Sequence, residues 1–227
     1  MKAKSIIKLV NVWKTYKMGE VEVHALRGLD IEVKRGEFLA IKGPSGSGKS
    51  TAMNLVGCLD IPSKGHVYLE GKDISLLTES DLAQIRGRKI GFIFQQFNLI
   101  NTLSALENVM LPMMFQDVPE DKRRKRAAEL LTKVGLGDRL HHKPAELSGG
   151  QQQRVAIARS LSVDPEVILA DEPTGNLDSE TGRTFMAFLK KLHKEEGKTI
   201  VMVTHDDMLA KEAGRIEHIK DGQLVKR

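Results

Sequence analysis

The 227-residue sequence predicts an α/β fold with a mainly parallel sheet, an N-terminal antiparallel β subdomain and a helical subdomain. Three observations lead to this prediction. A glycine-rich loop lies between a strand pattern and a helix pattern, several short apolar runs end in polar residues, and alternating strands precede the loop. With 41% hydrophobic residues the chain can bury one substantial core. We therefore expect one domain over 1–227, with the helical subdomain at about 97–160.

The composition of the chain excludes few functions but indicates the compartment in which the protein works. The formal net charge of +5 and pI of about 9.2 are mildly basic and by themselves select no partner. The single cysteine, Cys58, cannot form an internal disulfide, and its apolar neighbours favour a buried, inert thiol. The first residues lack the apolar core of a signal peptide, and no apolar run approaches the roughly 20 residues that span a bilayer. These features predict a soluble, cytoplasmic protein.

The N-terminal region is predicted to be an antiparallel sheet. Residues 6–12, 21–26 and 29–33 have strand patterns, and the last alternates apolar and charged residues. Gly19 and Gly36 mark turns. Tyr16 lies in this region, where it could be an ordinary strand aromatic or could stack on a nucleotide base through its flat π face.

The stretch 43–50, Gly-Pro-Ser-Gly-Ser-Gly-Lys-Ser, fits the phosphate-binding loop pattern and is followed by Thr51. Its glycines allow positive φ, and its N–H groups can form an anion-binding concavity at a helix N-terminus. Lys49 can reach the β- and γ-phosphates, and the Ser50 hydroxyl can bind Mg²⁺. The strand pattern at 37–41 and helix pattern at 51–56 supply the context that a flexible linker would lack. The loop therefore predicts a nucleoside-triphosphate site.

The middle of the chain continues the alternation of strand and helix patterns. Residues 65–71 read as a strand, 79–88 as a helix, and 90–94 as a buried strand that ends at Gln95 and Gln96. Polar residues at the carboxyl end of a core strand lie where α/β sheets bind ligands, although these two taken alone favour a surface turn.

Residues 104–134 have helical spacing, with a second helix opening at Pro119. One face of the first helix carries Leu106, Val109, Met110, Met113 and Met114. Such a methionine-rich face indicates core, and where partly covered it could also dock a partner. The basic run 122–126 surrounds the second helix and has no interleaved aromatics, so a solvated face is favoured over a nucleic-acid patch.

A second anion-binding pattern occurs at 147–154, Leu-Ser-Gly-Gly-Gln-Gln-Gln-Arg. Ser148 is a good N-cap, and the following run has helical spacing, so Gly149 and Gly150 present N–H groups at a helix N-terminus. Because one nucleotide already has the loop at 43–50, this site is either idle or serves another chain's nucleotide.

Two further strands end in chemically useful residues. Residues 167–170 are apolar and precede Asp171 and Glu172, which could hold Mg²⁺ and activate a water molecule respectively. Asp178 can cap the helix that runs to residue 196. Residues 199–204 form a strand pattern that ends at His205. Residues 215–226 read as a hairpin that turns at 221–222.

Taken together, these motifs resemble the ATP-binding subunit of ATP-binding cassette (ABC) systems, and the resemblance runs from Tyr16 to the closing hairpin. It implies an ATPase with ATP and Mg²⁺ as cofactors. It implies that Tyr16 stacks on adenine, that Glu172 is the general base, that His205 contacts the γ-phosphate, and that Gln95, preferred over Gln96, senses Mg²⁺ and a membrane partner. The implied catalytic residues are Lys49, Gln95, Glu172 and His205, and the implied metal ligands are Ser50, Gln95 and Asp171. The implied nucleotide contacts are Tyr16, Gly43, Ser45, Gly46, Ser47, Gly48, Lys49, Ser50, Thr51, Ser148, Gly149, Gly150, Gln151 and Asp178.

The resemblance also implies the assembly. Two subunits pack head to tail, so that each Ser148-Gly149-Gly150 segment covers ATP held by the other subunit's loop, with Asp178 crossing the same interface. The loop 173–178, Pro-Thr-Gly-Asn-Leu-Asp, departs from the commoner Ser-Ala-Leu-Asp form. It looks most like the ATPases of lipoprotein-releasing and macrolide-efflux complexes, in which an integral membrane permease-type subunit is the partner and the ATPase sits on the inner face of the cell membrane.

Other functions share part of this pattern. A chromosome-organising or DNA-repair ATPase would need a long coiled-coil insertion between residues 50 and 147, where no sustained heptads occur. A ribosome-acting factor would carry two cassettes in one chain. The alternative of an ABC-type ATPase acting on DNA or the ribosome therefore ranks second, and no nucleic-acid partner is expected.

Overall fold

The computed structural model describes residues 4–225, which group into two compact units. The first unit comprises residues 4–86 and 190–225, and the second comprises residues 87–189. The second unit contains the stretch 97–160 for which a helical subdomain is predicted. Two helices, α2 (Glu79–Lys89) and α6 (Ser179–Glu196), cross the boundaries between the units in sequence.

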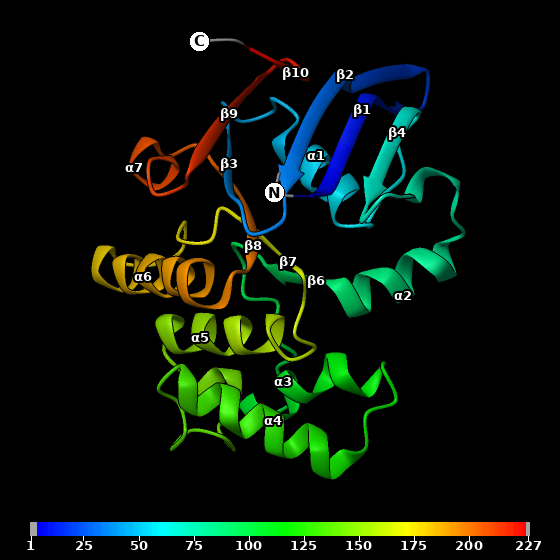
Figure 1. The fold of residues 1–227 in the computed structure, drawn as a ribbon. Helices are drawn as coiled ribbons and strands as arrows, with labels where there is room; N and C mark the ends of the chain where they lie inside the picture. Colours follow the sequence, from blue (N-terminus) through cyan, green and yellow to red (C-terminus); the bar gives the residue numbers. More distant parts are fainter. Residues whose placement is uncertain (1–3, 226–227) are drawn as a thin grey trace. The chain divides into compact units, whose positions relative to one another are not determined.

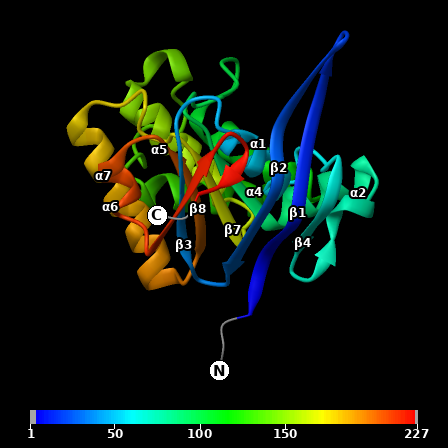
Figure 2. The same ribbon diagram turned by 90° about the horizontal axis from the view of Figure 1, so that it is seen from above.

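An antiparallel sheet begins the first unit. Its strands are β1 (Ser5–Met18), β2 (Val21–Lys34), β4 (Lys64–Leu69) and β5 (Lys72–Asp73), in the order β2-β1-β4-β5. β1 and β2 form one long hairpin, which Figure 2 shows side by side along its length. The antiparallel prediction is confirmed.

The predicted boundaries within this sheet were wrong, because three short strands were expected and two 14-residue strands are present. The expected break at residues 27–28 is an irregularity inside β2. Gly28 has φ +76, and a Cβ there would lie 3.1 Å from the Asn11 Oδ1 atom. The pairing of β1 with β2 shifts register at this level, so the glycine marks a bulge and not a turn.

The first unit also contains parallel strands. β3 (Phe38–Lys42) pairs in parallel with β8 (Thr199–Thr204) on one side and β9 (Arg215–Lys220) on the other. β8 is buried along its whole length, as expected of a central parallel strand. β10 (Gln223–Leu224) pairs antiparallel with β9 through a turn in which Asp221 and Gly222 both have positive φ, so the predicted hairpin is confirmed. Helices α1 (Lys49–Val56) and α7 (Asp207–Ala210) and the short 3-10 turn η1 (Ile74–Leu76) complete this unit.

The second unit joins a two-stranded parallel ladder to helices. β6 (Ile90–Ile93) pairs in parallel with β7 (Val167–Asp171). α3 (Ala105–Met114) packs against α4 (Glu120–Lys133) and α5 (Gly149–Ser160), as Figure 1 shows in green, and the turn η2 (Pro144–Glu146) precedes α5. Gly91 allows close packing within this unit, since a Cβ there would lie 2.4 Å from the Ser160 carbonyl oxygen. Among residues 4–225, no helix is long and apolar enough to cross a membrane.

The methionine-rich face of α3 divides into a buried and an exposed part. Met113 is only 3% exposed and belongs to the core with Leu106 and Val109. Met114 is 46% exposed and Phe115, which follows α3, is 72% exposed. The interpretation of Met113 as part of a docking surface is therefore corrected, because helical periodicity groups residues on a face without showing how much of that face a neighbouring helix covers.

Candidate functional site

The phosphate-binding loop leads directly into α1, as predicted. Gly48 is the N-cap, with φ +98, and no side chain caps this helix end. The first N–H groups of a helix have no partners within the helix, so this end carries a partial positive charge that favours an anion. Lys49 is 5% exposed, and its Nζ donates to the Pro44 carbonyl at 2.8 Å. The ammonium group thus lies folded over the loop, where a phosphate oxygen could replace that carbonyl as its acceptor.

Close packing explains two of the glycines. A Cβ on Gly43 would lie 2.2 Å from the Ile219 carbonyl oxygen, and one on Gly48 would lie 2.5 Å from that of Ala25. The N–H of Gly222 donates to the Ser47 carbonyl at 3.0 Å, so the β9–β10 turn supports the loop from behind. The Ser47 hydroxyl is buried and has no hydrogen-bond partner among the described residues. A closely packed loop whose Ser47 hydroxyl has no hydrogen-bond partner among the described residues fits a phosphate group.

Sheet register brings His205 to the same edge as this loop. Lys42 is the register partner of Thr204 in the parallel β3–β8 pair, so the chain leaves β3 at Gly43 and β8 at His205 side by side. Asp206 then caps α7 by accepting from the N–H of Met208 at 2.6 Å. His205, 162 positions after Gly43 in the sequence, thereby lies beside the start of the phosphate loop.

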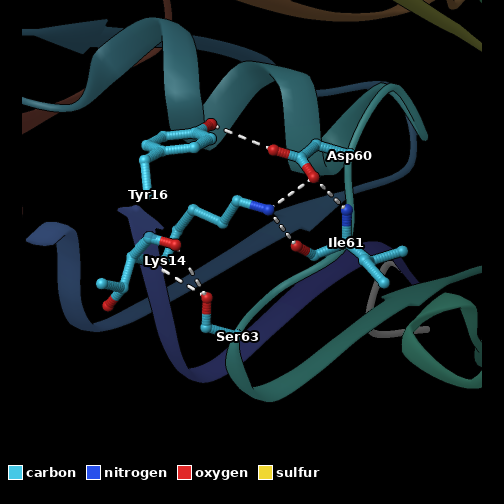
Figure 3. Close-up of polar contacts among 6 residues, drawn as sticks. Lys14, Tyr16, Asp60, Ile61 and Ser63 are labelled. Carbon is cyan, nitrogen blue, oxygen red and sulfur yellow. Dashed lines mark hydrogen bonds and ion pairs between the residues drawn. The ribbon is translucent and has the colours of Figure 1, made fainter. Parts of the chain in front are cut away.

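Tyr16 lies on β1 and is partly exposed. Its hydroxyl donates to Asp60 Oδ2 at 3.0 Å (Figure 3). Burial and the adjacent Asp60 carboxylate raise the pKa of the phenol, which therefore stays protonated as a donor. Sequence reasoning did not find Asp60. The available signal was an acidic residue just after the loop helix, two positions before a proline.

The second anion-binding element lies in the second unit. Ser148 is the N-cap of α5, and its hydroxyl accepts from the Gln151 N–H at 3.3 Å, while Gln151 Oε1 accepts from the Ser148 N–H at 2.8 Å. This reciprocal capping box confirms the predicted helix start. The Ser148 and Gln151 side chains thereby define the loop shape, and the helix end presents Gly149 and Gly150.

Parallel pairing also aligns the polar strand ends of this unit. Ile93 is the register partner of Ala170, so Gln95 and the Asp171-Glu172 pair leave β6 and β7 at the same edge. The Asn176 Nδ2 donates to the Gln95 carbonyl at 3.0 Å, and a Cβ on Gly175 would lie 2.7 Å from Gln95 Nε2. Gln95 therefore packs on the loop 173–178.

A buried glutamine connects α5 to the segment that follows β7. Gln153 of α5 is buried, and its Nε2 donates to the Pro173 carbonyl at 2.9 Å. Pro173 directly follows Glu172, which has φ 42, an uncommon conformation outside glycine. The α5 helix thus braces the turn that carries the proposed base. Sequence reasoning missed Gln153, because three adjacent glutamines do not reveal which of them faces inward.

Asp178 caps α6 as predicted. Its carboxylate accepts from the Thr181 hydroxyl at 2.6 Å, from the Thr181 N–H at 2.9 Å and from the Glu180 N–H at 3.0 Å. The hydrogen bond from the Thr181 hydroxyl is the main cause that lowers the pKa of Asp178, so the residue stays charged. A pocket of about 500 Å³ lies beside it, and its lining includes Ser148, Gly150, Phe185 and Phe188.

The predicted residues are thus gathered into two groups. The first unit holds Tyr16, the loop with Lys49 and Ser50, and His205. The second unit holds Gln95, the segment 148–151, Asp171, Glu172 and Asp178. Among residues 4–225, no cluster of three His, Cys, Asp or Glu side chains could hold a metal ion. A hydroxyl, a carboxylate and phosphate oxygens are nevertheless a normal ligand set for Mg²⁺.

The chain is similar to known proteins along most of its length. A family model described as ABC transporter matches residues 26–175. An uncharacterized ABC transporter ATP-binding protein of Thermotoga maritima is 57% identical over 221 residues, covering 97% of this chain and 94% of its own length. A macrolide export ATP-binding/permease protein, MacB, of Syntrophobacter fumaroxidans is 50% identical over 96% of this chain, which corresponds to 31% of that protein.

A solved structure shows the same fold. It is a dimeric post-hydrolysis state of the ATP-binding cassette MJ0796 bound to ADP and Pi, and that protein comes from Methanocaldococcus jannaschii. Its TM-score to this chain is 0.90 at 52% identity, with 97% of both chains covered.

Proposed function

This chain belongs to the ABC transporter family and is an ATP-hydrolysing subunit, and on that premise we propose that it drives an integral membrane permease-type partner in export, lipoprotein release or mechanotransmission. The observation that carries the ATP-dependent pairing in this proposal is the presence of two anion-binding helix starts, at Gly48 and at Ser148, in one chain. One nucleotide needs only the first of them. The second is accounted for when two copies pair and each covers the other's ATP.

In this proposal the phosphate loop binds the β- and γ-phosphates. Lys49 exchanges its hydrogen bond to the Pro44 carbonyl for phosphate oxygens, and the N–H groups at the start of α1 hold the remaining charge. Ser50, Asp171 and Gln95 would hold Mg²⁺, which when bound neutralises charge that develops on the phosphates. Glu172 accepts a proton from the attacking water, and His205 contacts the γ-phosphate. The Ser148-Gly149-Gly150 segment of a second copy, with Gln151 and Asp178, completes the site.

A direct assay tests the proposed activity. Purified protein should hydrolyse ATP in the presence of Mg²⁺, with a rate that rises more than linearly with protein concentration because two copies form each site. Lys49→Ala should remove the activity, since it removes the phosphate contact. Activity that is insensitive to Lys49→Ala, or strictly linear in protein concentration at all levels, would contradict the shared-site mechanism.

Base recognition is expected to be weakly selective, because stacking on Tyr16 contacts a π face and not a hydrogen-bond pattern. Tyr16→Ala should weaken ATP binding by roughly 1–3 kcal/mol, the usual contribution of one base–aromatic contact, and excess GTP should compete with ATP. Titration calorimetry measures both effects. The matched control is Tyr68→Ala, the other tyrosine of the chain, which lies on β4. Equal losses in the two variants would argue against stacking on Tyr16.

The membrane partner is proposed to dock at the exposed end of α3, which in the same unit lies beside Gly87 and Arg88, where Arg88 Nε donates to Gln116 Oε1 at 2.9 Å. Phe115→Asp and Met114→Asp should abolish stimulation of the ATPase by the partner while leaving basal hydrolysis within about twofold, since both side chains are exposed. Met113→Asp is the matched control. It should lower the melting temperature sharply, because it buries a carboxylate in the core. Normal partner stimulation in both exposed variants would refute this docking surface.

The relatives support the membrane assignment over the alternative. MacB is named as an ATP-binding/permease protein, and the matching cassette is about a third of its length. An ABC-type ATPase acting on DNA or the ribosome has no support in these matches. We infer a position on the cytoplasmic face of the membrane, reached through the permease, and no nucleic-acid partner.

A further inference from the structure

We propose that Lys14 and Asp60 are positioning residues that hold the Tyr16 ring as the platform for the nucleotide base. The proposal rests on the function proposed above, specifically on stacking of the base on Tyr16. It assigns a positioning role to two residues that have no other role in the ATPase mechanism proposed above. All three residues lie in the first unit, with Lys14 and Tyr16 on β1 and Asp60 in the segment after α1.

Asp60 is the centre of this network (Figure 3). Its Oδ2 accepts from the Tyr16 hydroxyl at 3.0 Å, and its Oδ1 accepts from Lys14 Nζ at 2.5 Å. The Oδ1 atom also accepts from the N–H of Ile61 at 2.8 Å, which fixes the carboxylate relative to its own backbone. The ring of Tyr16 therefore cannot swing away from its position without breaking a hydrogen bond to a charged acceptor, which is stronger than one between neutral groups.

Lys14 restrains the same ring from a second direction. Its Nζ lies 5.0 Å from the centroid of the Tyr16 ring, within the range of a cation–π contact. The Nζ also donates to the Ile61 carbonyl at 2.8 Å, so the ammonium is held between the ring and the segment that carries Asp60. Because Lys14 pairs with Asp60, the carboxylate does not stand near a triphosphate as an uncompensated negative charge.

The backbone around this network is also tied together. The N–H of Thr15 donates to the Ser63 hydroxyl at 3.0 Å, and the N–H of Ser63 donates to the Trp13 carbonyl at 2.8 Å. Asp60 lies four residues after the end of α1, the helix that begins at the phosphate loop, and the N–H of Leu59 donates to the Asn54 carbonyl of that helix at 2.9 Å. The base platform and the phosphate loop are therefore held at a set separation. A platform that is ordered before binding loses less conformational freedom when the base stacks on it.

The experiment compares two ligands that differ in the base. ATP and inorganic tripolyphosphate are titrated into wild type, Asp60→Ala, Lys14→Met, Tyr16→Ala and the double variant Tyr16→Ala/Asp60→Ala. Asp60→Ala and Lys14→Met are each expected to weaken ATP binding by about 2- to 12-fold, the effect of freeing one side chain. Tripolyphosphate binding should be unchanged, KM for ATP should rise, and kcat should stay within about twofold. Asp60→Asn retains an acceptor and should restore most of the affinity.

The double variant gives the decisive comparison. If Asp60 acts through Tyr16, its removal adds no further loss once the ring is absent. Additive losses, or equal weakening of ATP and tripolyphosphate, would overturn the proposal and indicate a general structural role. If Asp60→Ala does not fold, Tyr16→Phe serves instead. That variant keeps the ring but removes the donor to Asp60, and unchanged ATP affinity in it would equally overturn the proposal.

Failure of the proposed function is distinguishable from failure of this inference. Loss of binding of both ligands in Lys49→Ala tests the phosphate site and does not depend on Asp60. Unchanged ATP affinity in Tyr16→Ala would refute stacking, and the positioning role would be refuted with it.

Discussion

Glu172→Gln is expected to lower the rate of ATP hydrolysis by roughly 10²- to 10⁴-fold, the usual contribution of general-base catalysis. The amide keeps the size of the side chain but cannot accept a proton from water. The local backbone should be unaffected, since the turn at Glu172 is braced from α5 by the hydrogen bond from Gln153 to the Pro173 carbonyl. ATP should still bind, because Lys49 and Ser50 belong to a different part of the chain. Single-turnover hydrolysis assays and nucleotide titration measure the two effects separately.

The same variant should reveal the dimer. With the nucleotide uncleaved and one negative charge removed near the γ-phosphate, two subunits should stay closed on two ATP molecules. Gel filtration with light scattering should show Glu172→Gln as a dimer in ATP, and the wild type mainly as a monomer at low concentration. Glu129→Gln, on the exposed side of α4, makes the same chemical change elsewhere and should behave as wild type. A Glu172→Gln protein that hydrolyses ATP normally, or remains monomeric in saturating ATP and Mg²⁺, would refute both the base and the shared site.

Ser148→Arg is expected to abolish the ATP-dependent dimer and, with it, essentially all hydrolysis. The arginine replaces a small N-cap at the point where the α5 start is proposed to meet the partner's nucleotide, so its bulk would prevent closure. Loss of the cap should cost only about 1 kcal/mol of stability, so the subunit should remain folded. The assay is the oligomeric state of the Glu172→Gln/Ser148→Arg double variant in ATP.

Two controls separate crowding from other effects. Each control is made in the Glu172→Gln background, where Ser148→Ala loses the cap without adding bulk and should leave the ATP-dependent dimer intact. Glu195→Arg adds an arginine at an exposed position of α6 and should also dimerise, since its ion pair with Lys191 at 3.8 Å lies on the surface. ATP binding to monomeric Ser148→Arg should be close to wild type, because the phosphate loop of the same chain is intact. A Ser148→Arg protein that still dimerises would place the interface elsewhere.

Features that depend on neighbours in sequence were predictable. The start of α1 follows from glycines that permit positive φ and from the Gly-Lys-Ser sequence, and the start of α5 follows from a serine three residues before a glutamine. The caps at Ser148 and Asp178 and the turn at Asp221-Gly222 are also local, since each is closed by hydrogen bonds within a few residues. The apolar runs before Glu172 and His205 identified the polar ends of two parallel strands because buried strands read as continuous hydrophobic segments.

Contacts between distant segments required the tertiary structure. Asp60 meets Tyr16 across 44 residues, and the Gly222 N–H supports the Ser47 carbonyl of the phosphate loop from the far end of the chain. Met113 and Met114 share a helix face in the sequence pattern, yet packing buries the first and leaves the second exposed. The sequence by itself determined the phosphate-loop pattern, the candidate general base and the helix caps of this protein, because those features belong to a residue and its neighbours. Only the tertiary structure decided which residues hold Tyr16 and which methionine faces solvent, because burial and long-range hydrogen bonds depend on which segments the fold brings together.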